Sequence, residues 1–161
     1  ASVSGAAIRL CAKCSAQQQS NIAWAFATLT LQDVPLLQAL SVAAKATISD
    51  YGSQNLSNMA WALATRMFSD RPLLDVIAAA ALPRIDTFIP QELASTAWSV
   101  AKMPFQHAPL LDALSCAFLR KIDQMDAMNL SNMAWSLATL SVSDQPLLNA
   151  VAGASVAACR D

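Results

Sequence analysis

The feature that most restricts the fold of this chain is an internal repeat of 37 residues. All four tryptophans recur at this spacing, and so do four prolines, each of which is followed by two leucines. The two columns are Trp24, Trp61, Trp98 and Trp135, and Pro35, Pro72, Pro109 and Pro146. A fixed period of this length is typical of proteins that stack one small unit several times, because a single unit cannot bury its apolar face alone.

The first helix of each repeat is predicted to begin near the proline. Proline suits the first turn of a helix, where its missing N–H would have no partner anyway. An aspartate two residues earlier can accept a hydrogen bond from a free N–H group of that turn, and it is present as Asp33, Asp70 and Asp144. The first leucine after each proline is expected in the core, at Leu36, Leu73, Leu110 and Leu147.

The second helix of each repeat carries the tryptophan. Between residues 55 and 65, the apolar residues Leu56, Met59, Ala60 and Leu63 recur at the spacing of one buried helix face. Small residues flank every tryptophan, which suits close helix packing. We therefore expect all four tryptophans to wedge between helices in the core, with stacking on nucleic-acid bases as the alternative role.

These helices predict a single all-α domain over residues 1–161, a right-handed α-solenoid of stacked antiparallel helix pairs. The repeat phases are 1–34, 35–71, 72–108, 109–145 and 146–161, which makes four pairs and one extra helix, nine helices in all. Neither end has the polar face of a capping repeat. The expectation is that the native chain continues or that partners cover its ends, and the missing initiator methionine suggests a processed chain or a fragment.

Composition excludes several functional classes. Apolar residues make up 55% of the chain and charged residues 13%, with a mean hydropathy of +0.40, which is too apolar for a disordered chain. Apolar runs such as Val76–Leu82 are too short to cross a bilayer, and three scattered glycines cannot form a phosphate-binding loop. One histidine, His107, cannot build a histidine metal site or a proton relay. We therefore expect no enzyme activity, cofactor, metal or small-molecule substrate.

The Cys11-x-x-Cys14 pair has the spacing of half a zinc or redox motif, but the repeat alignment favours packing. Cys11, Cys14, Cys116 and Cys159 all fall in columns that other repeats fill with apolar residues. A structural zinc needs four ligands, and the chain has no second pair of this spacing. All four cysteines are expected to be small core residues without disulfide bonds, which suits a reducing compartment.

Two sets of polar residues are candidate contacts with RNA or with a partner protein. The first is the column three residues before each tryptophan, Asn21, Asn58, Ser95 and Asn132. Its alternative role, a ladder of hydrogen bonds between neighbouring helices, is favoured because nearly identical residues cannot discriminate bases. The second is a basic edge where first helices end, Arg84, Arg120 and Lys121, whose alternative role is to complement the helix dipole.

The segment from Pro72 to Met103 resembles the octotricopeptide and heptatricopeptide repeat families. The signature of their second helix is matched by Pro90, Gln91, Leu93, Ala94, Trp98 and Ala101. The resemblance covers essentially the whole chain and implies a helical solenoid in a chloroplast or mitochondrion. It also implies the role of those families, which is to bind organellar RNA for processing, stability or translation, or to serve as a structural subunit of an organellar ribosome.

Two functions therefore remain open from the sequence. The formal net charge of −1 provides few cations for RNA phosphates, and four repeats would read only about four nucleotides. Low charge and high apolar content suit an element embedded in a larger assembly. The sequence favours a non-catalytic scaffold whose partners are protein subunits of an organellar complex, and organellar single-stranded RNA binding is the alternative.

Overall fold

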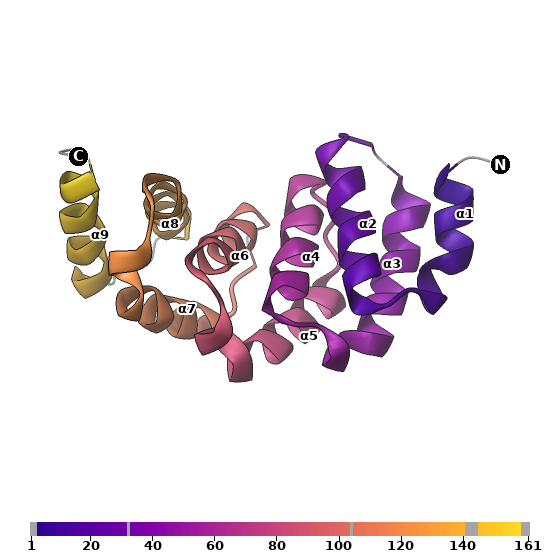
Figure 1. Ribbon diagram of the computed structural model, residues 1–161, viewed down its shortest axis with the longest axis horizontal. Coiled ribbons are helices and arrows are strands. Elements are labelled where there is room, and N and C mark those ends of the chain that lie inside the picture. The colour runs from indigo at the N-terminus through magenta and orange to yellow at the C-terminus, as the bar shows by residue number, and fades with distance from the viewer. Residues whose placement is uncertain (1–2, 32, 104, 141–144, 159–161) are drawn as a thin grey trace.

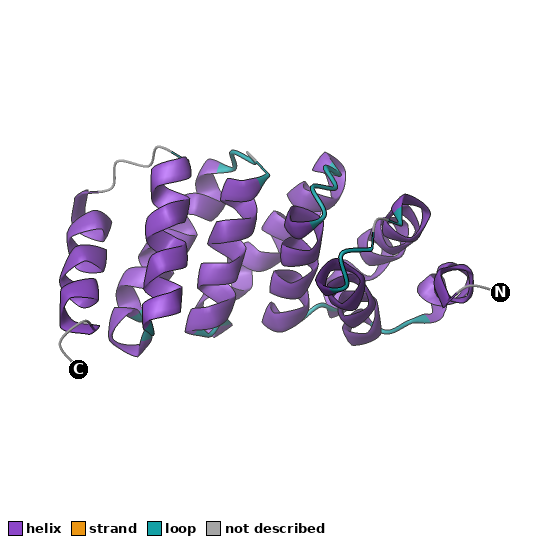
Figure 2. Ribbon diagram, turned by 90° about the horizontal axis from the view of Figure 1, so that it is seen from above, coloured by secondary structure: helices purple, strands orange, loops and turns teal. Residues whose placement is uncertain are grey.

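The structure is a computed structural model that describes residues 3–31, 33–103, 105–140 and 145–158. Within these ranges every regular element is a helix, and short turns join the elements (Figure 2). The described chain contains nine α-helices stacked one after another (Figure 1). The predictions of an all-α fold, a stacked solenoid and nine helices are therefore confirmed.

The helices form two rows, one inside the other. The outer row consists of the first helices, α1 (Val3–Leu10), α3 (Val34–Thr47), α5 (Arg71–Ala81), α7 (Ala108–Arg120) and α9 (Gln145–Ala158). The inner row consists of the second helices, α2 (Ala16–Thr28), α4 (Ser53–Thr65), α6 (Pro90–Lys102) and α8 (Ala127–Thr139). Four outer helices continue into short 3-10 turns, Cys11–Lys13, Ile48–Asp50, Leu82–Thr87 and Ile122–Gln124. Figure 1 shows the outer row curving around the inner row, so the inner row lines the concave side.

The outer helices begin where the proline and the capping residue predict. The side chains of Asp33 and Asp70 each accept a hydrogen bond from the backbone N–H three residues later, at 2.9 and 3.0 Å. In the next repeat Nδ1 of His107 accepts the same bond at 3.2 Å. The predicted aspartate caps are confirmed at both described positions, and Asp144 lies outside the described residues.

The apolar core lies between the two rows. The leucines that follow each proline are almost completely buried, with 0 or 1% of their surface exposed at Leu36, Leu73, Leu110 and Leu147. On α4, the predicted buried face of Leu56, Met59, Ala60 and Leu63 is also buried. Each repeat thus contributes apolar residues from both of its helices to one continuous core, which the neighbouring repeats complete.

Two sequence expectations about burial are wrong in part. The four tryptophans were expected in the core, but Trp24 and Trp135 are 47% and 44% exposed, because the tryptophan position faces the concave side of the inner row. Trp61 and Trp98 are partly buried and pack against the core. Cys116 is exposed, because its column lies on the outer surface of the outer row, where Val42 is also exposed. Cys11 is buried, Cys14 is half-buried, and both are free thiols. Cys159 lies outside the described residues.

No helix in the described part of the chain has the length and apolarity needed to cross a membrane.

Candidate functional site

The concave side of the solenoid carries partly exposed side chains at regular positions, four on each inner helix. Within a helix these four residues are spaced by four, three and four residues, which places them on one side of the helix. All are exposed or half-buried. We call these positions the inner face: Gln17, Asn21, Trp24 and Thr28 on α2; Gln54, Asn58, Trp61 and Thr65 on α4; Gln91, Ser95, Trp98 and Lys102 on α6; Met128, Asn132, Trp135 and Thr139 on α8.

The tryptophans of the inner face form two pairs. The ring centroids of Trp24 and Trp61 are 6.4 Å apart, and the planes are tilted by 35°. Trp98 and Trp135 repeat this arrangement at 6.2 Å and 34°. Both distances fall within the range of attractive aromatic pairs. The tryptophans therefore stabilise the contact between neighbouring inner helices while they leave part of each ring accessible.

A groove of about 350 Å³ lies between the two tryptophan pairs. Its walls include Trp61 and Trp98, and its polar lining residues are Gln91, Ser95, Asn129 and Asn132. A smaller groove of about 90 Å³ adjoins it, because Gln91 and Ser95 also line that groove together with residues of α4 such as Asn58. The two grooves form one trough that crosses α4, α6 and α8.

The trough is bordered by three of the four predicted polar contacts, Asn58, Ser95 and Asn132, whereas Asn21 lies outside it on α2. Among the described residues, the side chains of these four positions form no hydrogen bond between repeats. The expected ladder is formed by neighbouring positions instead. Asn55 Nδ2 donates to Ser20 Oγ at 3.0 Å, which joins α4 to α2. Ser57 Oγ donates to the backbone oxygen of Glu92 at 3.3 Å, which joins α4 to α6. The amides of the inner face are therefore available to a partner.

The inner face is almost without charge. Lys102 is the one charged residue among its positions, and its Nζ lies 5.2 Å from the centroid of the Trp98 ring, within the range of a cation–π contact. An acidic residue, Glu92, lines the smaller groove and accepts a hydrogen bond from the N–H of Ile89 at 3.0 Å. The trough thus lacks the row of cations that a phosphate backbone requires.

The predicted basic edge has a structural role at the junctions between repeats. Arg84 donates to the backbone oxygens of Ser49, at 3.0 Å, and Tyr51. Lys121 donates to the backbone oxygens of Asp86 and Phe88, at 2.8 and 2.5 Å. These acceptors belong to the turn of the preceding repeat, so the cations hold adjacent repeats together.

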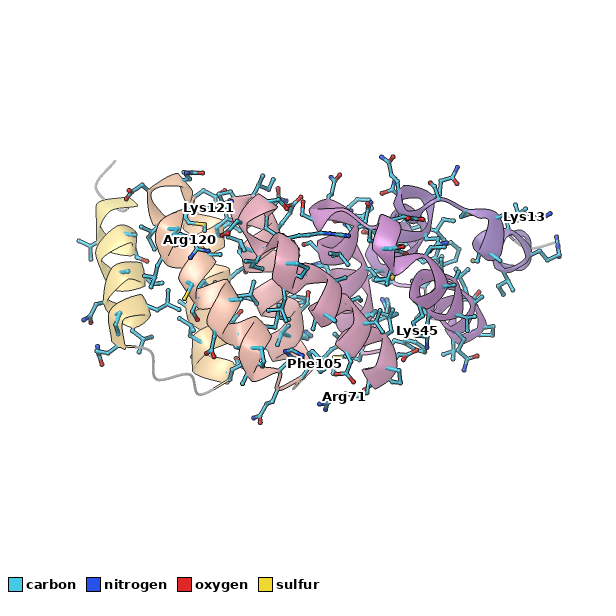
Figure 3. The ribbon with its side chains drawn as sticks, turned by 90° about the horizontal axis from the view of Figure 1, so that it is seen from below. Lys13, Lys45, Arg71, Phe105, Arg120 and Lys121 are labelled. Carbon is cyan, nitrogen blue, oxygen red and sulfur yellow. The ribbon has the colours of Figure 1, made fainter. Side chains whose placement is uncertain are left out.

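Arg120 differs from the other two basic residues because it lies on the surface. Its guanidinium pairs with Asp86, and more than half of each side chain is exposed. Figure 3, which shows the side opposite to Figure 2, places Arg120, Lys121, Lys45 and Arg71 along the outer row. The structure therefore separates the two predicted sets of contacts: the amides lie on the concave side and the basic edge lies on the outer row.

The first junction uses a buried glutamine in place of a cation. Gln19, which is 0% exposed, donates from Nε2 to the backbone oxygens of Cys11 and Cys14 at 3.3 and 2.9 Å. Its Oε1 accepts from the hydroxyls of Tyr51, at 2.8 Å, and Thr47, at 3.3 Å. Sequence reasoning missed this network, although two signals were present in the sequence: Gln19 stands in a column of leucines, and Tyr51 is the one residue with a hydroxyl in a column otherwise made of Cys14, Phe88 and Met125.

Burial keeps the ionisable groups near this network neutral. It raises the pKa of the Tyr51 phenol, and the nearby Cys11 adds to the effect. Burial likewise raises the pKa of the Cys11 thiol, with a smaller contribution from Cys14. A thiol of raised pKa is a poor nucleophile and a poor metal ligand. Within the described ranges, no three His, Cys, Asp or Glu side chains lie close enough together to hold a metal ion.

Comparison with known families matches residues 2–145 to the family described as RNA-editing substrate-binding complex 6 protein. No curated protein matches the chain. The resemblance to the octotricopeptide and heptatricopeptide families is therefore corrected, because the family that matches is a different one whose name also refers to RNA. The matched segment extends from α1 to the start of α9 and so contains all four inner helices. The chain belongs to the RNA-editing substrate-binding complex 6 protein family.

Proposed function

We propose that the chain is a non-catalytic helical-repeat subunit of an RNA-editing substrate-binding complex, in which it holds protein subunits together. The name of its family supports membership in such a complex. Two stacked rows of helices expose a long surface for the size of the chain, and solenoids use such surfaces to bind partners. We also propose an organellar location, the mitochondrion rather than the chloroplast, and this proposal rests on the family alone.

One observation carries the preference for protein over RNA as the principal partner. Of the three basic residues that were candidates for phosphate contacts, Arg84 and Lys121 already bind backbone oxygens of the preceding repeat. A cation held in this way would have to leave a carbonyl group unsatisfied in order to reach a phosphate. The third, Arg120, is paired with Asp86.

Single-stranded RNA is the second candidate partner, and the exposed tryptophans favour it. Bases of any sequence can stack on aromatic side chains, and Trp24 and Trp135 are nearly half exposed. Against this stands the charge of the inner face, because aromatic stacking in such proteins accompanies a groove rich in cations. We therefore place RNA second.

The test combines purification with direct binding. The tagged chain is purified from its source with and without ribonuclease, and the proteins that accompany it are identified. In parallel, the isolated chain is titrated into a labelled single-stranded 20-mer RNA at 50 and 200 mM salt. We expect the same protein subunits in both preparations, and RNA binding no tighter than about 10 μM, typical of weak non-specific association.

A variant of the exposed residue Arg120 helps to separate protein binding from RNA binding. Arg120→Glu reverses an exposed charge and removes only the surface ion pair with Asp86, while the hydrogen bonds of Arg84 and Lys121 to backbone oxygens stay in place, so the assembly is expected to survive it. Loss of the protein partners after ribonuclease, together with tight and salt-dependent RNA binding that Arg120→Glu weakens, would reverse the order of the two candidates.

A further inference from the structure

The trough on the inner face carries a small polar side chain at the equivalent position of three successive inner helices: a carboxamide, a hydroxyl and a carboxamide. Asn58 and Asn132 border its two ends, with Ser95 at the equivalent position between them. A carboxamide both donates and accepts hydrogen bonds. A row of nearly identical side chains can only recognise a group that also recurs along the partner. A polypeptide backbone has such a group, because each residue offers one N–H and one C=O.

The inner helices α4, α6 and α8 pack directly against one another, which sets the distance between successive polar side chains of the trough. Packed helices lie about 8–10 Å apart. A polyproline II segment completes one turn in three residues and about 9 Å, so each turn would meet one inner helix. Extended segments of this kind bind in grooves lined by aromatic side chains, and Trp61 and Trp98 are walls of the trough.

The low charge of the trough favours a peptide over an RNA strand. Lys102 lies over the Trp98 ring, and Glu92 adds a carboxylate to the smaller groove. An RNA strand that crossed three helices would bring several phosphates to a surface with one cation and one anion. An uncharged peptide has no such cost, because its polar groups pair with the neutral amides.

We infer that the trough across α4, α6 and α8 binds an extended, uncharged segment of a partner protein in a polyproline II conformation. The side chains of Asn58, Ser95 and Asn132 hydrogen-bond its backbone, and its apolar side chains or prolines lie against Trp61 and Trp98. The inference rests on the proposed function, since it identifies the surface through which a scaffold subunit would hold one of its partners.

The experiment uses a library of random 12-residue peptides displayed on phage and selected against the chain. The most enriched peptide is synthesised with a fluorescent label, and its affinity is measured by anisotropy. We expect enriched peptides without charged residues and with prolines at three-residue intervals. Asn58→Ala and Asn132→Ala should each raise the Kd at least five-fold. Gln38→Ala, an amide exposed on the outer helix α3, is the matched control and should change the Kd less than two-fold.

Three results would overturn the inference. The first is that no peptide is enriched. The second is that the two asparagine variants bind the enriched peptide as well as the control does, while circular dichroism shows them folded. The third is that a uridine 20-mer binds the chain and the asparagine variants weaken that binding, which would assign the trough to RNA.

Failure of this inference can be told apart from failure of the proposed function. The double variant Asn58→Arg and Asn132→Arg blocks the trough, and its assembly is examined after ribonuclease treatment. Retention of all protein partners by this variant would show that the scaffold uses another surface. Loss of partners from the unmodified chain after ribonuclease would contradict the scaffold function itself.

Discussion

Arg84 and Lys121, which are 37 residues apart, each donate hydrogen bonds to two backbone oxygens in the turn of the preceding repeat. The turn ends the outer helix of that repeat, so its carbonyl groups have no partner within their own helix. Because the contact recurs, the main interaction of these basic residues is with the carbonyl groups of the neighbouring repeat rather than with the dipole of their own helix. These cations are therefore expected to contribute to the stability of the fold.

Removing either of these cations should destabilise the fold. Arg84→Met and Lys121→Met keep the aliphatic part of the side chain but leave two backbone oxygens without a donor. We expect each to lower the free energy of unfolding by about 1.5–2 kcal/mol, at the low end of the range for hydrogen bonds to charged groups, because these bonds are partly exposed. Urea denaturation followed by circular dichroism measures the change. Arg120→Met, which breaks only a surface ion pair, is the control and should stay within about 0.5 kcal/mol. Equal effects for all three variants would contradict the assignment.

Much of the fold follows from columns of residues in the sequence. Proline with a preceding aspartate predicts the start of an outer helix. The aspartate accepts a hydrogen bond from a free N–H group of the first turn, and the proline has no N–H that needs a partner. The prediction of a core position for all four tryptophans is wrong in part, although the spacing of apolar residues on α4 indicates exposure. Trp61 lies two residues after Met59, which rotates it by about 200° from the buried face of α4. Its angular position therefore predicts exposure, whereas its size alone suggested the core.

The role of the basic edge could not be predicted in the same way. The acceptors of Arg84 lie 33 and 35 residues earlier in the chain, and they approach it only because the repeats stack at a particular distance. No local pattern encodes that distance. The grooves of the inner face have the same origin, since they form between side chains of three successive inner helices.

The hydrogen bonds that Gln19 donates at the first junction between repeats should be replaceable by those of a lysine. Lys121 forms such bonds at the junction that follows α7. Gln19→Leu alone removes the partner of the Tyr51 hydroxyl and of the Cys14 backbone oxygen, so we expect a loss of about 2–3 kcal/mol. The triple variant Gln19→Leu, Thr47→Lys and Tyr51→Phe rebuilds the junction that Lys121 forms. The backbone conformations agree, with φ −123° and ψ 16° at Thr47 and φ −115° and ψ 12° at Lys121.

The triple variant is expected to recover at least half of the stability that Gln19→Leu loses, as measured by urea denaturation. Gln17→Leu, an exposed change on the same helix, is the control and should stay within about 0.5 kcal/mol of the unmodified chain. A triple variant less stable than Gln19→Leu would mean that the two junctions are not equivalent.

Asp70 should make the stability of the chain depend on pH in acid. Burial acts to raise the pKa of its carboxyl group, but hydrogen bonds from Ser41, from the N–H of Leu73 and from Lys45 outweigh burial and lower that pKa. A carboxylate with a lowered pKa stabilises the fold above its unfolded pKa and loses this effect as the pH falls through the folded value. The stabilisation is therefore complete at neutral pH, begins to weaken near the unfolded pKa of about 4 and is lost as the pH falls through the lower folded pKa.

The comparison of the unmodified chain with Asp70→Asn isolates this effect, because asparagine can still cap α5. We expect the unmodified chain to be more stable at pH 7, and the difference to shrink as the pH is lowered to 3. Thermal unfolding at five pH values measures it. Asp75→Asn, which breaks an exposed pair with Arg71 on the same helix, should change stability by less than about 0.5 kcal/mol at pH 7. A difference for Asp70→Asn that is constant between pH 3 and 7 would refute the role of its ionisation.

His107 occupies the capping position that aspartate holds in the two preceding repeats, and the column predicts that aspartate would serve better there. Its Nδ1 accepts from the N–H of Leu110 at 3.2 Å, which satisfies the first turn of α7 without a negative charge. His107→Asp keeps the acceptor and adds a charge that complements the helix dipole, a contribution of about 0.3–1 kcal/mol. The loss of the ring contact with Phe105, at 5.7 Å between centroids, opposes this gain. We expect a small net increase in melting temperature for His107→Asp, no gain for His107→Asn and a loss of about 1 kcal/mol for His107→Ala. If His107→Asp is destabilised as much as His107→Ala, the contact with Phe105 rather than the cap determines the stability of this turn.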